Sequence, residues 1–280
     1  MLTFDDGPSN ERFAALGTHP DGTPRTPTEA VLDRLRAEGI AAAFFVLTGP
    51  DLAFPGRRLA KGETALGLHT LRRSVREGHV LACHWGGRYG SQLRGHPASL
   101  ALPAYDADGD GEIDRARGAG SALESELLAC MARVGEALAA EGRAGERVDF
   151  VRPPLWRFRD GDRDARPTYA ALGLRMVLAD ERVPDGAMTR GLAWFGEEMV
   201  ERVVERVRRG DAHVVIALHD VNRRTAAGLP ALLERLRERL AQEGLMEDAA
   251  WRFARDAAEV RAALREQGRE ADGLGASAAR

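Results

Sequence analysis

The sequence has few of the features that would assign it to a specialised class of protein. Its 280 residues include two cysteines, Cys83 and Cys130, whose separation suits neither a zinc ribbon nor a disulfide-rich scaffold. Cys130 has helical spacing relative to Leu127 and Val134, so we expect a buried thiol there. No apolar run is long enough to cross a membrane, and no leader of basic, apolar and small residues opens the chain as given. We therefore expect a soluble protein.

An excess of positive charge is also missing. The formal net charge is −3, Lys61 is the only lysine, and no uniformly basic stretch is present, so a nucleic-acid partner is not expected. The chain lacks a GxGxxG fingerprint, a Walker loop, a serine-centred elbow and a CxxC pair. Dinucleotide, nucleotide and serine-nucleophile chemistry therefore find no support.

Short apolar runs alternate with longer amphipathic segments, which is the pattern of βα units around a parallel sheet or barrel. We predict an α/β fold, a distorted TIM-like (β/α) barrel of seven or eight units, as a single domain over residues 1–255 with an insertion at about 86–120. A peripheral helix that ends in disorder is expected over residues 256–280. The expected strands are 2–4, 42–47, 79–83, 148–151, 175–178, 213–218 and 251–254. The expected helices are 28–38, 63–77, 122–141, 167–172, 197–209 and 230–243. The first helix is expected to be capped by Thr26 or Thr28 and stopped by Gly39.

Side chains able to do chemistry follow the ends of several of these strands. In a barrel the carboxyl ends of all strands open on one face, so residues distant in sequence converge there. A single Asp-Asp or His-Asp dipeptide is usually a solvated turn, but a whole set at strand ends favours an active site. The set comprises Asp5, Asp6, His84, Arg152, Asp180, His219 and Asp220.

Three motifs occur in this set: TFDDGP at 3–8, RPP at 152–154 and LHD at 218–220. In content and order they resemble the polysaccharide deacetylases of carbohydrate esterase family four, which include chitin-oligosaccharide deacetylases. The resemblance runs from Leu2 to about Phe253, and TFDDGP is its most specific string. It implies a metal-dependent hydrolase that removes acetyl groups from a glycan.

The resemblance also implies roles for the residues of the motifs. Asp5 would be the general base that activates a metal-bound water, and His219 the general acid that protonates the leaving amine. Arg152 would hold Asp5 ionised and oriented, and Asp180 would do the same for His219. Asp6 would be a metal ligand. The match at Asp180 is the weakest, because the segment ADERV lacks the tryptophan that the family shows there.

The remaining metal ligands are expected from histidines. The family places two of them four residues apart, but Arg88 stands four residues after His84, and arginine cannot bind a cation. His96 begins HPASL, which resembles the continuation of the second family histidine, so we assign Asp6, His84 and His96 as ligands of Zn²⁺, with Co²⁺ or Ni²⁺ as other candidates. The alternative is that His96 is an ordinary loop histidine and the site is degenerate.

An acidic segment, DADGDGEID, has the oxygen donors of a calcium loop at Asp106, Asp108, Asp110 and Asp114. Arg117 stands where the bidentate glutamate is expected. A weak Ca²⁺ site and a plain acidic turn therefore remain equal alternatives.

Substrate contacts are expected beside the proposed site residues. Trp85 and Trp156 could stack on a sugar ring, although packing explains them as well. Pro154 and Leu218 complete the candidate substrate-binding set.

We thus predict hydrolysis of N- or O-acetyl groups on a glycan of the chitin-oligomer, peptidoglycan or xylan type, with an acetylated carbohydrate as the partner. The alternatives are a barrel hydrolase that acts on a small non-glycan amide and a catalytically silent glycan-binding protein. The resemblance suggests an extracytoplasmic location. The oligomeric state is left open.

Overall fold

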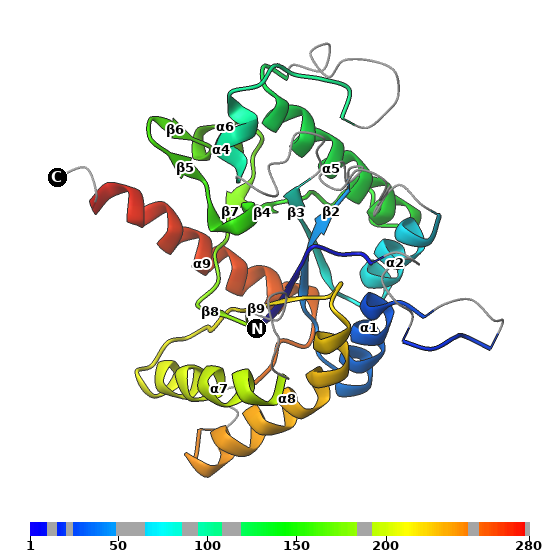
Figure 1. The fold of residues 1–280 in the computed structure, drawn as a ribbon, viewed down its shortest axis with the longest axis vertical. Coiled ribbons are helices and arrows are strands. Elements are labelled where there is room, and N and C mark those ends of the chain that lie inside the picture. Colours follow the sequence, from blue (N-terminus) through cyan, green and yellow to red (C-terminus); the bar gives the residue numbers. More distant parts are fainter. Residues whose placement is uncertain are drawn as a thin grey trace. The chain divides into compact units, whose positions relative to one another are not determined.

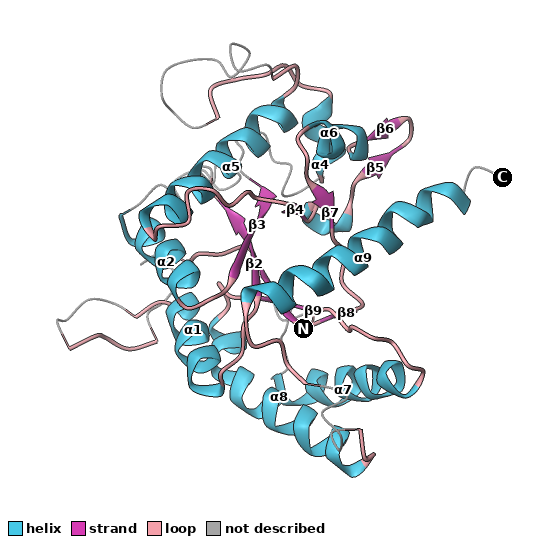
Figure 2. Cartoon of the chain, turned by 180° about the vertical axis from the view of Figure 1, so that it is seen from behind, coloured by secondary structure: helices cyan, strands magenta, loops and turns pink. Residues whose placement is uncertain are grey.

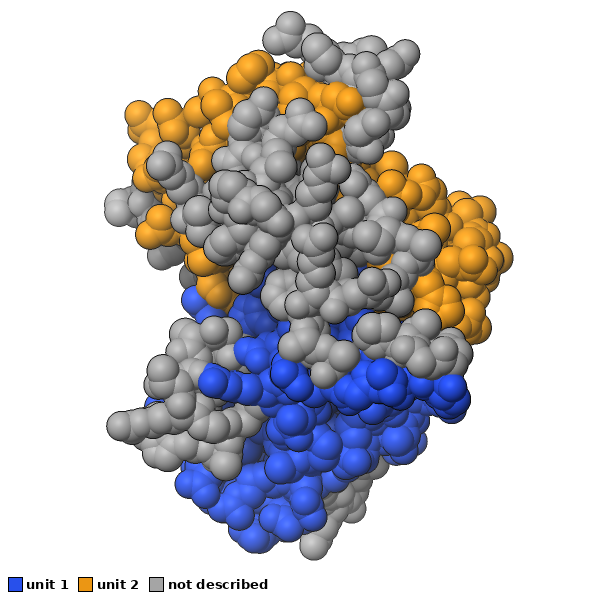
Figure 3. Space-filling view, turned by 45° about the vertical axis from the view of Figure 1, so that its right-hand side comes forward, with its two compact units in different colours: residues 1–44, 77–80, 179–267 blue, residues 45–76, 81–178, 268–280 orange. Residues whose placement is uncertain are grey.

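The computed structural model describes residues 1–9, 16–20, 25–48, 65–85, 95–107, 119–183, 192–245 and 252–277. The chain forms two compact units, coloured in Figure 3. Unit 1 comprises Met1–Phe44, Glu77–Val80 and Ala179–Gln267, and unit 2 comprises Phe45–Arg76, Leu81–Leu178 and Gly268–Arg280. The chain passes from one unit to the other within β2 (Ala43–Leu47) and β3 (Val80–Trp85).

Seven strands form one sheet in the order β7-β4-β3-β2-β1-β9-β8 (Figure 1). Every pairing of this sheet for which a register is described is parallel. The α/β prediction of a distorted (β/α) barrel is confirmed. Besides β2 and β3, the strands are β1 (Leu2–Asp5), β4 (Phe150–Val151), β7 (Arg175–Met176), β8 (Glu181–Arg182) and β9 (Ile216–His219).

Unit 1 is built on β1, β8 and β9. Helix α1 (Pro27–Glu38) begins with a capping box in which the Thr26 hydroxyl accepts from the Glu29 N–H, and it ends at Gly39 with φ 63°. Thr26, not Thr28, is therefore the cap. Helix α1 packs on α8 (Arg223–Gln242), and α8 packs on α7 (Leu192–Arg208), as Figure 2 shows.

Helix α8 begins seven residues earlier than the sequence predicts. We expected Pro230 to start it, but Pro230 lies inside the helix, and the Asn222 side chain caps the true start by accepting from the Arg224 N–H. The lost backbone hydrogen bond at the proline is tolerated because flanking residues such as Leu229 and Leu233 are fully buried.

The described part of unit 2 holds β4, β7 and the helices α2 (Ala65–Arg76), α4 (His96–Leu100), α5 (Ala122–Ala140) and α6 (Arg166–Ala171). The helix α5 starts with a capping box between Ser121 and Glu124, and it packs on α2 and α4. A hairpin of β5 (Arg159–Asp160) and β6 (Arg163–Asp164) precedes α6. Between β4 and β5 lies the 3₁₀ turn η2 (Pro154–Trp156).

Helix α9 (Ala257–Ser277) confirms the helix expected after residue 255. The strand expected at 251–254 is not formed, since the described residues Arg252–Ala254 have no regular structure. At Gly268 a Cβ atom would lie 2.2 Å from Cδ of Arg175, so a side chain there would collide with β7. No helix within the described ranges is long and apolar enough to cross a membrane.

The two cysteines correct the expectation of a buried thiol. Cys83 on β3 and Cys130 on α5 form a disulfide whose ends are 47 residues apart in sequence. Both residues are fully buried. The bond ties the helix to the residue immediately before His84, so it braces the strand end at which a candidate site residue lies.

Replacing both Cys83 and Cys130 by alanine should lower the free energy of unfolding by about 2–4 kcal/mol, the usual effect of losing a link across a loop of this length. Urea titrations of the variant and of wild type with and without reductant measure this change. Reduced and oxidised wild type of equal stability, or two free thiols in unreduced wild type, would contradict the assignment.

Candidate active site

The pairing of β1 with β9 places Asp5 beside His219. The strands are parallel and in register from Leu2 with Ile216 to Asp5 with His219. Parallel strands end at the same edge of a sheet, so the two side chains emerge at neighbouring strand ends. Asp5 is 2% exposed, and this burial results from the fully buried strand LTFD that carries it.

Asp6 is the next residue and lies closer to solvent. Its Oδ2 is 4.0 Å from Nε2 of His219, and the two side chains are 24% and 33% exposed. Asp6 adopts φ 72°, in the left-handed region, which costs roughly 1–2 kcal/mol for a residue with a Cβ. Surrounding contacts must stabilise this backbone.

Two further residues adjoin this carboxylate pair: Asp220, which the sequence places at a strand end without giving it a role, and Arg182, which sequence reasoning missed. Asp220 is fully buried, and its Oδ2 accepts a hydrogen bond from the Thr28 hydroxyl at 2.6 Å. Arg182 on β8 is desolvated, which lowers its pKa, while the charge of Asp5 acts in the opposite direction. The position of Asp220 directly after His219 was a usable signal; the pairing of β8 with β9 was not visible in the sequence.

Asp180 does not fit its expected role. Its Oδ2 accepts from the Val215 N–H at 2.7 Å, and its Oδ1 lies 3.2 Å from Nη1 of Arg206. Val215 precedes β9, whereas His219 ends it, roughly 13 Å along an extended strand. Asp180 therefore secures the start of the strand that His219 terminates.

Leu218 does not fit a substrate contact. It is fully buried and pairs with Phe4 in the β1–β9 ladder. Its side chain belongs to the core of unit 1.

In unit 2, His84 is the last residue but one of β3 and is 5% exposed. Its Nδ1 lies 2.7 Å from the carbonyl oxygen of Arg152, which can only accept, so Nδ1 carries the proton. Nε2 is then the nitrogen with the lone pair. A histidine fixed in this tautomer by a backbone carbonyl is the usual metal ligand of proteins.

His96 is also buried, but both of its ring nitrogens are engaged. Nε2 lies 3.0 Å from the carbonyl oxygen of His84 and therefore donates, so Nδ1 accepts from the Tyr169 hydroxyl at 2.5 Å. In this arrangement His96 offers no lone pair to a cation. Tyr169 is a further residue that nothing in the sequence signalled.

Arg152 is fully buried at the end of β4. Its Nε donates to the Val177 carbonyl at 3.2 Å, and its guanidinium carbon lies 3.9 Å from the ring centre of Phe45 and 5.0 Å from that of Trp156. A guanidinium keeps its charge even when it is buried, so Arg152 places a fixed positive charge directly after β4.

The turn that follows Arg152 is strained. Leu155 and Trp156 have φ 56° and 62°, although neither is glycine. Pro154 is buried, whereas Leu155 is 53% exposed and Trp156 is partly exposed. Strain of this kind clusters at ligand sites, which fits the expected substrate contact at Trp156.

The other expected site features lie largely outside the described residues. These are the side chain of Trp85 and, in the acidic segment, Asp108, Asp110 and Asp114; of that segment only Asp106, which is half-buried, and Ala107 are described. His79, at the N-terminal side of β3, is buried and accepts the Ala42 N–H at Nδ1.

The donor chemistry fits a divalent cation in part. Asp6 offers a partly exposed carboxylate, and His84 a fixed tautomer with Nε2 as acceptor, whereas His96 does not fit as it is hydrogen-bonded. Among the residues that the structure describes, no three His, Cys, Asp or Glu side chains gather closely enough to hold a metal ion.

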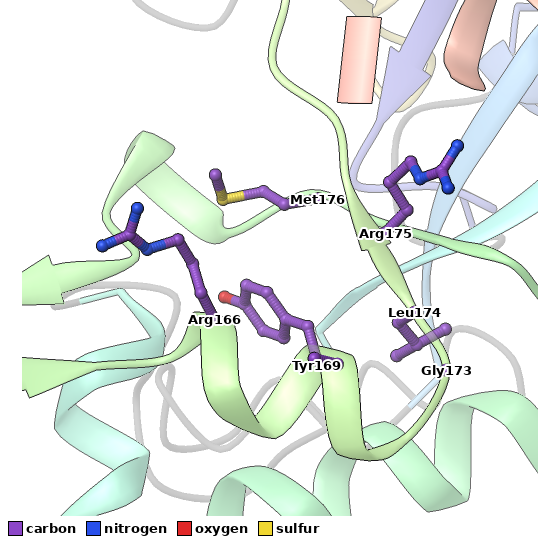
Figure 4. Close-up of a pocket in the computed structure, with 7 residues that line it drawn as sticks. Arg166, Tyr169, Gly173, Leu174, Arg175 and Met176 are labelled. Atoms are coloured by element: carbon purple, nitrogen blue, oxygen red, sulfur yellow. The ribbon is translucent and has the colours of Figure 1, made fainter. Parts of the chain in front are cut away.

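A cavity of about 240 Å³ lies beside α6 and β7 (Figure 4). Its polar groups are already engaged: Nε of Arg166 donates to Asp164 at 2.9 Å, and the Tyr169 hydroxyl is bonded to His96. No predicted site residue lines this cavity, so it is not the predicted active site. The lining residues are Arg166, Tyr169, Ala170, Gly173, Leu174, Arg175 and Met176.

No protein-family model and no curated protein matches the chain. Similar solved structures include a polysaccharide deacetylase from Bacillus cereus, 16% identical, covering 85% of this chain and 86% of that one, with a TM-score of 0.49. A family 4 carbohydrate esterase from Streptomyces lividans in complex with acetate is 22% identical, covers 87% and 88%, and has a TM-score of 0.47. A family 4 pseudoenzyme from Bacillus anthracis is 15% identical, covers 85% and 59%, and has a TM-score of 0.48. These structures come from the family that the motifs resemble, and the likeness concerns the fold alone.

The buried His96 should make stability depend on pH. Burial is the main cause that lowers its pKa to about 3, and His84 acts in the same direction. A histidine in the unfolded chain titrates near 6.5, so the folded state binds fewer protons between these values and stability is lost as the pH falls below about 6.5. From pH 7 to pH 5 the free energy of unfolding should fall about 2 kcal/mol more in wild type than in His96→Asn.

Urea unfolding at the two pH values measures this difference. His213→Asn is the control for replacing a histidine by asparagine at a less buried position, because the His213 side chain is 40% exposed. Equal slopes for wild type and His96→Asn would show that His96 is not held neutral.

Proposed function

We propose that the protein is a metal-dependent hydrolase that removes N- or O-acetyl groups from a glycan. The observation that carries this proposal is the register that sets Asp5 opposite His219, with the Asp6 carboxylate 4.0 Å from the same imidazole. A carboxylate and an imidazole at adjacent strand ends are the pair that acyl transfer needs as base and acid. The motifs TFDDGP and LHD contain all three residues.

Asp6 and His84 would hold the cation, which we propose to be zinc, with cobalt or nickel as substitutes. The bound cation would supply a polarised acetyl carbonyl and a water of lowered pKa. The motif resemblance proposes His96 as a third ligand. To bind the cation, His96 would have to give up the hydrogen bond between its Nε2 and the His84 carbonyl.

The protein's own residues would move the protons. Asp5, nearly inaccessible to bulk solvent, takes a proton from the attacking water, and Arg152 is proposed as the buried cation that keeps this carboxylate ionised. His219, one-third exposed, donates a proton to the leaving amine. Exposure lets the imidazole exchange protons with solvent between turnovers.

Trp85, Pro154 and Trp156 are proposed to contact the acetylated carbohydrate, a glycan of the chitin-oligomer, peptidoglycan or xylan type. The strained turn at Trp156 supports this assignment. The acidic segment containing Asp106, Asp108, Asp110 and Asp114 stays a proposal for Ca²⁺.

The disulfide supports a location outside the cytoplasm. Disulfides persist in oxidising compartments and are rare where glutathione keeps thiols reduced. The Cys83–Cys130 bond therefore agrees with the extracytoplasmic location that the resemblance suggests.

Acetate release tests the proposed reaction. The zinc-loaded protein should release acetate from at least one of acetylated chitin oligomers, acetylated peptidoglycan fragments and acetylated xylan, and Asp5→Ala should release none. Turnover of a small acetamide without any glycan activity would favour the non-glycan hydrolase, and no turnover of either class would contradict the proposal.

The two proton roles predict different substrate dependence. Asp5→Asn should lose roughly two to four orders of magnitude in kcat on every substrate, because the base is always needed. His219→Ala should be severely impaired on an acetamide but much less on an activated phenyl acetate, whose leaving group needs no proton. An equal loss on both substrates would show that His219 positions groups and is not the acid.

A catalytically silent glycan-binding protein is the second candidate. It is favoured by the hydrogen bonding of His96, which leaves neither ring nitrogen open to a metal. Retained binding of acetylated glycans with no acetate release would identify it.

A further inference from the structure

A buried series of hydrogen-bonded polar side chains supports the segment that carries Asp5 and Asp6. The proposed chemistry does not use these side chains. The series runs from Ser9 through Thr28 to Asp220, and all three residues are at most 1% exposed. It links the residue after His219 to helix α1 and to the end of the TFDDGP segment.

Hydrogen-bond directions in this series follow from the acceptor at its end. The Asp220 carboxylate accepts from the Thr28 hydroxyl at 2.6 Å, which fixes the Thr28 proton. Oγ1 of Thr28 then accepts from the Ser9 N–H at 2.9 Å and from the Ser9 hydroxyl at 2.9 Å, and Oγ of Ser9 accepts the Thr28 N–H at 3.0 Å. One buried hydroxyl thus ties the loop to the carboxylate.

Gly7 provides a second contact with the same carboxylate. A Cβ atom at Gly7 would lie 2.0 Å from Oδ2 and 2.4 Å from Oδ1 of Asp220, so the carboxylate packs directly on the glycine backbone. A residue with a side chain could therefore not replace Gly7 without displacing Asp220.

The loop is therefore held at two points, Gly7 and Ser9, directly after Asp6. Gly7 contacts Asp220 directly and Ser9 contacts it through Thr28, while Asp6 between the strand and Gly7 keeps the unfavourable φ of 72°. His219 precedes Asp220 in the chain, so one residue constrains both the imidazole and the loop that faces it.

We propose that Asp220 is a positioning residue that, through Thr28, fixes the loop at residues 5–9 and thereby the place of Asp6 relative to His219. This inference rests on the proposed function, in which Asp6 holds the cation and His219 is the general acid. It predicts that losing the Thr28 hydroxyl loosens the loop and weakens metal binding, although Thr28 touches neither cation nor substrate.

The test compares Thr28→Val, which keeps the shape and removes the hydroxyl, with Thr28→Ser, which restores it. Amide hydrogen exchange of residues 5–9 should be at least about tenfold faster in Thr28→Val and near wild type in Thr28→Ser. Zinc affinity, measured by competition with a chelator, should fall about 10- to 100-fold in Thr28→Val only, the usual effect of losing support behind a ligand. The matching loss in acetate release should appear in kcat with little change in KM.

Unchanged loop exchange in Thr28→Val would overturn the inference, as would faster exchange with unchanged zinc affinity. If Thr28→Val lowers the stability of the whole unit, exchange rises throughout unit 1 and not only in residues 5–9. Asp220→Asn is then measured instead, since it keeps an acceptor for Thr28 and removes only the charge. It decides whether loop exchange and zinc affinity change without unfolding. A wild-type protein that binds zinc but releases no acetate would count against the proposed function alone.

Discussion

The parallel pairing of β1 with β9 is the constraint on which the candidate site depends. Its register sets Asp5 opposite His219 although 214 positions separate them in the sequence, and a slip of one strand by one residue would turn the side chain of that strand to the other face of the sheet. The pairing is secured at both ends: Asp180 binds the Val215 N–H before β9, and Asp220 packs on Gly7 after β1. The chemistry proposed for Asp5, Asp6 and His219 follows from this geometry.

In unit 2 several contacts constrain the imidazole ring of His84 and the strand that carries it. The Arg152 carbonyl fixes the tautomer of His84, the disulfide at Cys83 braces the strand before it, and His96 binds the His84 carbonyl. Each contact fixes either the backbone or the tautomer of His84, in which Nε2 is the lone-pair nitrogen. These contacts therefore restrain the residue that we propose as a metal ligand.

The sequence predicts the elements with strong periodicity and the residues within specific motifs, and it fails where long-range contacts decide. Helices α1 and α5 follow from their caps and apolar spacing, whereas the two-residue strands β5, β6 and β8 carry no pattern of their own. Cys83 and Cys130 read as unrelated because only the fold brings them together. Asp180 and Leu218 were assigned from their places near predicted strand ends, but Asp180 accepts from the Val215 N–H and Leu218 is buried in the core. Thr28 was weighed only as a cap.

Metal content tests the central claim most directly, since it asks whether Asp6 and His84 serve one cation. Protein purified without chelator should carry about one equivalent of zinc, cobalt or nickel by elemental analysis, and Asp6→Ala and His84→Ala should each carry close to none. His79→Ala serves as the control, because its ring nitrogen binds the Ala42 N–H, and it should retain the metal. Wild type without metal after incubation with zinc, or retention of the metal by both ligand variants, would contradict the account.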